Sequence, residues 1–166
     1  MFMKKFILLL YTCAVLTSCA DKPFVIIQIA DAQLGFDAAV KGQAPDAEYV
    51  NDLTYETEFL KQAVQKVNVL KADAVVFTGD QVNKPEDALQ WDTFADAISE
   101  IDSQTSVFHI PGNHDVLLSE GKVDITPFSS RYGEDRFVYS DNKVCIVGIN
   151  SNLIKSNDPR EEEQFE

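Results

Sequence analysis

Short apolar runs alternate with helical patterns along most of the chain. Three runs, at residues 24–30, 73–80 and 106–110, are rich in β-branched and aromatic residues, and each is followed by polar residues. Between them, at about 52–70 and 85–101, apolar residues recur at steps of three and four, as one face of a helix requires. This alternation predicts a parallel or mixed sheet flanked by helices, which is an α/β fold.

Two further apolar runs predict a hairpin after the third strand. They span residues 136–140 and 143–150, and Asp141-Asn142 stands between them as the turn. We expect Trp91 and Phe94 to pack in the core as part of a helical apolar stripe, rather than to form a platform for stacking bases.

The N-terminus has the layout of a secretory signal peptide. Lys4 and Lys5 precede an apolar run at residues 6–16, which is well short of the roughly 20 residues needed to span a bilayer. The segment "LTSC" then resembles the lipobox of bacterial lipoproteins, in which the cysteine, here Cys19, is lipidated. The alternative is an ordinary signal followed by a chance cysteine.

This layout predicts three segments and localisation to the cell envelope. Residues 1–18 would be the signal peptide, residues 19–23 the lipidated cysteine and a tether, and residues 24–166 the folded domain. Because several acyl chains anchor a protein stably, the mature chain would be held on a bacterial membrane, facing the periplasm or the surface, without crossing it.

The charge of the chain argues against nucleic acid as a partner. The formal net charge is −13, and removal of residues 1–18 takes away two lysines and no acids, which leaves −15. Removal of the signal and acylation of Cys19 would leave only Cys145, so no disulfide framework is expected. Its apolar surroundings predict that Cys145 is a small buried side chain.

Polar side chains follow each of the three predicted parallel strands. Asp31 and Gln33 follow the first, Asp80 the second, and Asn113 and His114 the third. Sites in open α/β sheets form beyond the carboxyl ends of the strands, so these side chains can meet in one cleft. Taken singly, Asp31 can also be a residue that starts a loop, and Gly-Asp is a common turn.

In this order, "DAQ", "GDQVN" and "GNHD" resemble the first three motifs of the calcineurin-like metallophosphoesterases, relatives of the purple acid phosphatases. The resemblance covers about residues 24–150. It implies an αββα sandwich, in which two mixed β-sheets are flanked by helices. It also implies hydrolysis of phosphomonoesters or phosphodiesters by a dinuclear metal centre with a bridging hydroxide.

The resemblance also assigns roles to individual residues. Asp80 would bridge the two metal ions, Asp31 would bind the first, and the amide oxygen of Asn113 would bind the second. His114 would donate a proton or hydrogen bond to the leaving oxygen, with Asp115 orienting its imidazole. Gly112, the glycine of the third motif, has no Cβ, which would let the backbone approach the metals closely.

The first motif departs from the family pattern at Gln33, where the family usually has histidine, although some branches carry glutamine. An amide oxygen is a harder ligand than imidazole, so Mn, Fe or Mg is expected in preference to Zn.

The family also supplies later histidines, including a Gly-His-x-His segment, whereas this chain contains only His109 and His114. Residues 158–163 have the composition of a helix start. We therefore expect the N-terminal part of a longer protein, with the domain truncated at its C-terminus. His109 precedes the turn, within a strand, and is expected to be structural.

Two other functions stay open. The chain would be a catalytically incomplete fragment or a non-catalytic lipoprotein binding domain if its metal ligands do not suffice. The second alternative is that residues 113–115 catalyse hydrolysis without metal, although no G-x-S-x-G nucleophile motif is present. The sequence names no particular substrate.

Overall fold

Three parallel strands form the central sheet of the computed structural model, which describes residues 22–41, 52–119, 122–154, 156 and 158–165. The strands are β1 (Ile26–Ile29), β2 (Ala74–Phe77) and β3 (Ser106–His109), in the spatial order β1-β2-β3. They pair in register, with Ile26 opposite Ala74 and Ala74 opposite Ser106. The three strands predicted from the apolar runs are thus confirmed.

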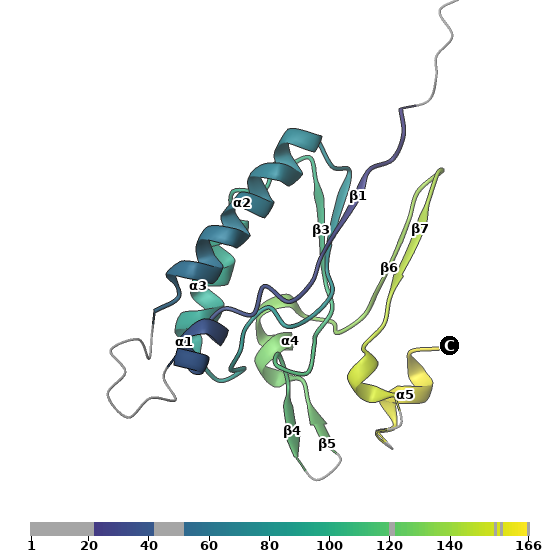
Figure 1. Cartoon of the computed structure of the whole chain (residues 1–166). Helices are drawn as coiled ribbons and strands as arrows, with labels where there is room; N and C mark the ends of the chain where they lie inside the picture. The colour runs from purple at the N-terminus through teal and green to yellow at the C-terminus, as the bar shows by residue number, and fades with distance from the viewer. Residues whose placement is uncertain (1–21, 42–51, 120–121, 155, 157, 166) are drawn as a thin grey trace, which may run out of the picture.

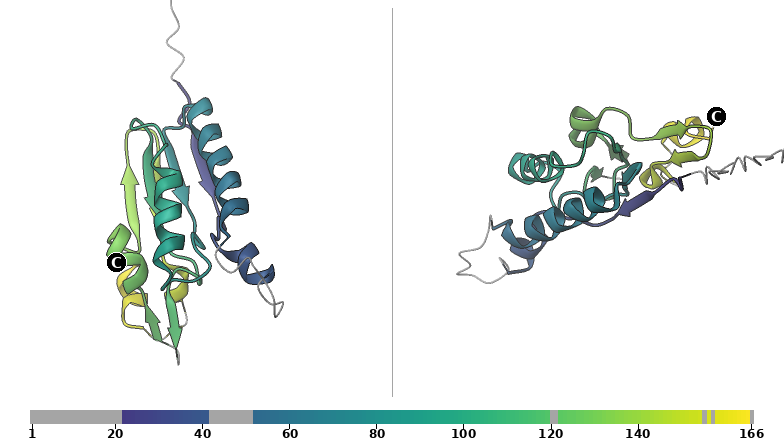
Figure 2. Two further views of the ribbon diagram at one scale, coloured as in Figure 1. Left: turned by 90° about the vertical axis from the view of Figure 1, so that its left-hand side faces the viewer. Right: turned by 90° about the horizontal axis from the view of Figure 1, so that it is seen from above.

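Two helices cover one face of this sheet, as Figures 1 and 2 show. They are α2 (Thr54–Leu70) and α3 (Ala88–Ile98), close to the predicted bounds. The start of α3 is fixed by Asp87, whose side chain accepts hydrogen bonds from the N–H groups of Leu89 and Gln90. The main core lies between the helices and the sheet and includes these side chains: Leu34, Leu60, Val64, Val67, Val75, Phe77, Phe94 and Ala97.

The predicted stripes are only partly buried. Trp91 and Phe94 are buried as expected, but Phe59 is 57% exposed and Leu70 is 50% exposed. Phe59 instead forms an aromatic pair with Tyr55 at a centroid distance of 4.9 Å. A periodic pattern selects a face of the helix, but the width of the buried stripe depends on what packs against it.

The predicted hairpin lies on the opposite side of the sheet (Figure 1). It consists of β6 (Phe137–Ser140) and β7 (Cys145–Gly148), which pair antiparallel. Phe137 stacks on Phe108 of β3 at a centroid distance of 4.5 Å. Cys145 lies on the outer face of the hairpin and is exposed, so the expectation of a buried cysteine is wrong. Its run alternates, and Cys145 shares the outward phase with Val147.

Several short elements were not predicted from the pattern. The first is α1 (Phe36–Lys41), which follows the first motif. The antiparallel pair β4 (Leu117–Ser119) and β5 (Lys122–Asp124) follows the third motif. Helix α4 (Thr126–Tyr132) and the 3-10 helix η1 (Ser151–Leu153) come later in the chain. All of these are seven residues or shorter, too short to show a period. The last element of the described residues, α5 (Arg160–Glu163), lies at the helix start that the composition of residues 158–163 predicts.

The architecture agrees with the expected sandwich at a coarse level. The chain is a mixed α/β structure with helices on one side of a parallel three-stranded sheet and a hairpin on the other. Within the described residues, however, the first sheet is wholly parallel and the second layer is one hairpin, so two mixed sheets are not seen. The signal peptide and Cys19 lie outside the described residues.

No helix in the described ranges has both the length and the apolar character needed to cross a membrane.

Candidate metal centre

The first two motifs are joined directly by main-chain hydrogen bonds at the carboxyl ends of β1 and β2. The N–H of Asp31 donates to the carbonyl of Gly79 at 3.2 Å, and the N–H of Gln33 donates to the carbonyl of Asp80 at 2.8 Å. A parallel bridge between Leu34 and Val82 extends the contact past the ends of the strands. The parallel topology thus brings together two loops separated by about 50 residues.

Three predicted metal ligands have left-handed backbone conformations. The φ angles are 56° for Asp31, 42° for Gln33 and 51° for Asp80. This region is sparsely populated by residues other than glycine, and such conformations concentrate at functional sites where the surrounding structure enforces them. The strain here coincides with the two loops whose main chains are hydrogen-bonded to each other.

The third motif packs against Asp80 because Gly112 has no side chain. A Cβ on Gly112 would lie 2.1 Å from Oδ1 of Asp80 and 2.3 Å from its main-chain nitrogen. The N–H of His114 also donates to Oδ1 of Asp80 at 2.9 Å. Gly112 therefore lets the turn after β3 approach the Asp80 carboxylate.

The imidazole of His114 is oriented by the main chain of the second motif. Its Nδ1 lies 2.9 Å from the carbonyl oxygen of Asn83. Because a carbonyl only accepts, Nδ1 must carry the proton in this contact, and Nε2 is left for other partners. The side chain of Asn83 also accepts a hydrogen bond from the Gln33 amide at 3.5 Å.

Asp115 does not orient His114, so this expectation is wrong. Its Oδ1 accepts from the N–H groups of Gln81 and Val82 at 2.9 and 3.2 Å, and its Oδ2 accepts from Gly112 at 2.8 Å. The Asp115 side chain is fully buried. Its carboxylate ties the turn after β3 to the loop after β2, and the carbonyl of Asn83 takes the role first given to Asp115.

Burial raises the pKa of Asp115 from 3.8 to about 7, and the negative charge of Asp80 acts in the same direction. The three N–H donors act in the opposite direction, because they stabilise the ionised form. Such a carboxylate supports the site by holding two loops together.

The residues that meet at the strand ends are mostly oxygen donors. Asp31 and Asp80 offer carboxylates, and Gln33 and Asn113 offer amide oxygens, which suits hard divalent ions. No group of three or more His, Cys, Asp or Glu side chains placed to hold a metal occurs in the part of the chain that the structure describes. Of the four predicted ligands only Asp31 and Asp80 belong to these residue types, so a metal site here would also depend on the amide oxygens of Gln33 and Asn113.

A hollow of about 270 Å³ adjoins Asp31, between the end of β1 and helix α2. Its walls include the exposed aromatic side chains of Tyr55 and Phe59, together with Leu60 and Glu56. Asp31 is shared between this hollow and the loops that carry the other predicted ligands. The hollow thus adds an apolar wall on one side of the candidate site.

Asn83 is the residue whose role the motif pattern did not predict. It closes the segment "GDQVN", so a signal was present, but its contribution to His114 is a main-chain carbonyl, which no side-chain pattern can reveal. Asn113 is exposed and follows the turn as predicted. His109 lies in β3 and stacks between Phe77 and Tyr132 at 5.0 and 3.9 Å, as expected for a structural histidine.

The comparisons with known proteins agree with this geometry. Residues 24–160 match the family model described as calcineurin-like phosphoesterase. No curated protein matches the chain.

Proposed function

Because the chain belongs to the calcineurin-like phosphoesterase family, we propose that it hydrolyses phosphomonoesters or phosphodiesters with two divalent metal ions. The family consists of phosphoric ester hydrolases and typically binds two metal ions. The observation that carries the proposal is the joining of all three motifs around Asp80, through Gln33 on one side and Gly112 and His114 on the other.

In this proposal Asp31 and Gln33 would hold one metal ion, Asn113 would hold the other, and Asp80 would contribute its carboxylate to both. The bound ions would neutralise phosphoryl oxygens and acidify a coordinated water. Gln33 and Asn113 favour Mn, Fe or Mg over Zn, since amide oxygen is a hard ligand. The positive charge of the ions also offsets the acidic surface, which would otherwise repel a phosphate ester.

His114 supplies the acid in this proposal. The carbonyl of Asn83 holds its Nδ1 proton, so that Nε2 is the ring atom that faces other partners. When the ring carries a proton on both nitrogens, Nε2 can donate its proton or a hydrogen bond to the leaving oxygen, which leaves the neutral ring with its proton on Nδ1. Asp115 contributes by fixing the turn that carries His114, through its bond to the N–H of Gly112.

The test is hydrolysis of an aryl phosphate and of an aryl phosphodiester by the purified chain, with added Mn²⁺, Mg²⁺ or Zn²⁺ and with chelator. We expect turnover with Mn²⁺ that chelator abolishes and that Asp80→Asn lowers by at least about 100-fold, because a neutral amide bridges two cations poorly. Asp92→Asn, on the exposed face of α3, is the matched control and should keep full activity. Activity that persists in chelator would favour metal-free hydrolysis by residues 113–115.

A second candidate is metal or phosphate binding without catalysis. It is favoured by the lack of any cluster of three His, Cys, Asp or Glu side chains within the described ranges. Calorimetric titration with Mn²⁺ separates the candidates. Weak or substoichiometric binding with no turnover would support a binding domain or an incomplete site, whereas two ions per chain with turnover would support the enzyme.

We further propose that the chain is a lipoprotein of a bacterial envelope, on the strength of the apolar run and the "LTSC" segment. Incorporation of labelled palmitate during expression in a bacterium is the test. The label should be lost in Cys19→Ser, while Cys145→Ser is the control and should keep it. Equal labelling of both variants would exclude Cys19 as the acylated residue.

A further inference from the structure

One peptide group next to the candidate metal centre is held at both of its ends by side chains. The carbonyl oxygen of Pro111 accepts a hydrogen bond from Nδ2 of Asn152 at 3.1 Å. The N–H of Gly112, in the same peptide group, donates to Oδ2 of Asp115 at 2.8 Å. Because a peptide group is planar, these two bonds fix its rotation as well as its position.

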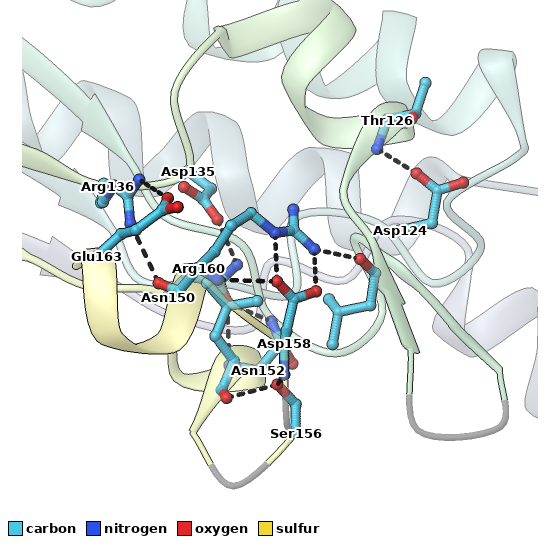
Figure 3. A network of polar contacts seen from close by, with 12 residues as sticks. Asp124, Thr126, Asp135, Arg136, Asn150, Asn152, Ser156, Asp158, Arg160 and Glu163 are labelled. Carbon is cyan, nitrogen blue, oxygen red and sulfur yellow. Dashed lines mark hydrogen bonds and ion pairs between the residues drawn. The ribbon is translucent and has the colours of Figure 1, made fainter.

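Asn152 is itself held by a chain of buried side chains. Oδ1 of Asn150 accepts from both the N–H and the Nδ2 group of Asn152, at 2.9 and 3.0 Å. Nδ2 of Asn150 in turn donates to Oδ2 of Asp135 at 2.8 Å. Asn150 is fully buried and Asp135 is 3% exposed. Figure 3 shows these three residues beside the ion pair of Asp158 and Arg160.

This chain of contacts aims the Asn152 amide before any ligand binds. A donor whose own rotamer is fixed loses little conformational entropy when it holds its acceptor. The side chain belongs to η1, more than 35 residues from Pro111 in sequence, so the contact depends on the tertiary structure.

The peptide held by Asn152 lies directly on the loop that carries Asp80. The Gly112 main chain is so close to this loop that a Cβ on Gly79 would lie 2.7 Å from the Cα of Gly112. Asn113 and His114 follow at once, and the N–H of His114 bonds to the Asp80 carboxylate. Rotation of this peptide would change where the Asn113 amide lies relative to Asp80.

We propose that Asn152 is a positioning residue of the metal centre, which fixes the Pro111–Gly112 peptide and thereby the placement of Asn113 against Asp80. The inference rests on the proposed metal-dependent function. Asn152 touches neither substrate nor metal in this role, and it acts through the Pro111 carbonyl. The first motifs of the sequence give no sign of it.

The test compares Asn152→Asp with the matched variant Asn68→Asp. Aspartate has the size of asparagine but cannot donate when ionised, so it would face the Pro111 carbonyl with a second acceptor. Asn68 is also half-buried and donates to a main-chain carbonyl, that of Glu100 at 2.8 Å, at the opposite end of the sheet. Both variants should lower the unfolding midpoint, because each loses its bond to a main-chain carbonyl, and Asn152→Asp also loses the bond from Nδ2 to Oδ1 of Asn150.

Two readouts go beyond this shared loss of stability. In Asn152→Asp, Mn²⁺ affinity measured by calorimetry should fall by about 10-fold or more, as expected when an outer contact of a metal site is removed. The Gly112 and Asp115 amides should also exchange their hydrogens faster without metal. Asn68→Asp should leave the affinity within about 2-fold of the parent and the Gly112 exchange unchanged. Asn152→Ala replaces Asn152→Asp should the aspartate variant fail to fold.

The outcomes separate this inference from the proposed function. Equal Mn²⁺ affinity and equal Gly112 exchange in the Asn152 and Asn68 variants would overturn the positioning role. A parent chain that binds no Mn²⁺ would overturn the proposed function. Hydrogen exchange of the Gly112 amide would then decide the inference alone. Faster exchange in Asn152→Asp would support the positioning role of Asn152, and unchanged exchange would overturn it.

Discussion

At the scale of single residues, the candidate site depends on groups that are absent as much as on those present. Gly112 has no Cβ at the point where Oδ1 of Asp80 lies, and Asp80 keeps a left-handed backbone to reach it. The Asp80 carboxylate thus lies against main chain on one side, where the N–H of His114 supplies a hydrogen bond. The geometry explains why a glycine stands at this point of the third motif.

Replacement of Gly112 by alanine should therefore damage the site. The new Cβ would overlap the Asp80 carboxylate, and the displacement of one loop should cost about 1–3 kcal/mol of unfolding free energy. Urea unfolding measures this loss, and Mn²⁺ titration should show weaker binding. Gly133→Ala is the control, since a Cβ there meets no atom within 4 Å, although its φ of 80° brings a cost of about 1 kcal/mol. Unchanged metal binding in Gly112→Ala would contradict the packing argument.

At the scale of elements, the β6–β7 hairpin attaches to the sheet through aromatic stacking. Phe137 and Tyr139 point toward Phe108 of β3, with ring centroids 4.5 and 5.3 Å apart. Their neighbour Val138 points the other way and is 73% exposed. The alternation expected of a strand with one covered face thus determines which side of the hairpin holds it to the sheet.

Phe137→Ala should loosen the hairpin. The loss of the ring removes its stacking and its apolar contact area, for which about 2–4 kcal/mol is expected at a partly buried position. Chemical denaturation measures the loss, and amide exchange should rise across both strands of the hairpin. Val138→Ala is the control on the outer face and should cost less than about 0.5 kcal/mol. Equal losses in the two variants would mean that the stack does not hold the hairpin.

At the scale of the whole molecule, one buried histidine links stability to pH. His109 stacks between Phe77 and Tyr132, and its Nδ1 has no hydrogen-bond partner among the residues that the structure describes. Burial lowers the pKa of His109 from 6.5 to about 4. The folded state therefore takes up the proton less readily than the unfolded state.

The sign of the effect follows from this difference. Well above pH 6.5 His109 is neutral in both states and has no influence on stability. As the pH falls through 6.5 to 4, the unfolded state is increasingly favoured, by up to about 3 kcal/mol. In His109→Phe, which keeps an aromatic ring but cannot titrate, unfolding free energy should fall less between pH 7 and 4.5. Parallel pH curves for His109→Phe and the parent would contradict the prediction.

The sequence by itself determined the order of the main elements and the identity of the motifs. Short runs of β-branched and aromatic residues and stripes of period 3.6 depend on neighbouring residues, so β1, β2, β3, α2 and α3 could all be predicted. The motifs could be found for the same reason, since Asp80 or Asn113 is recognised by the residues directly beside it. Short elements such as α1 and η1 lack a full period and were not predicted.

The tertiary structure alone decided how these motifs meet. The inward turn of Asp115, the carbonyl of Asn83 at His114, and the amide of Asn152 at Pro111 are contacts between segments about 30 or more residues apart. They use main-chain groups, which every residue carries, so no side-chain pattern distinguishes the ones that matter. The sequence thus supplies the ligands of the candidate site, whereas packing decides which groups hold them in place.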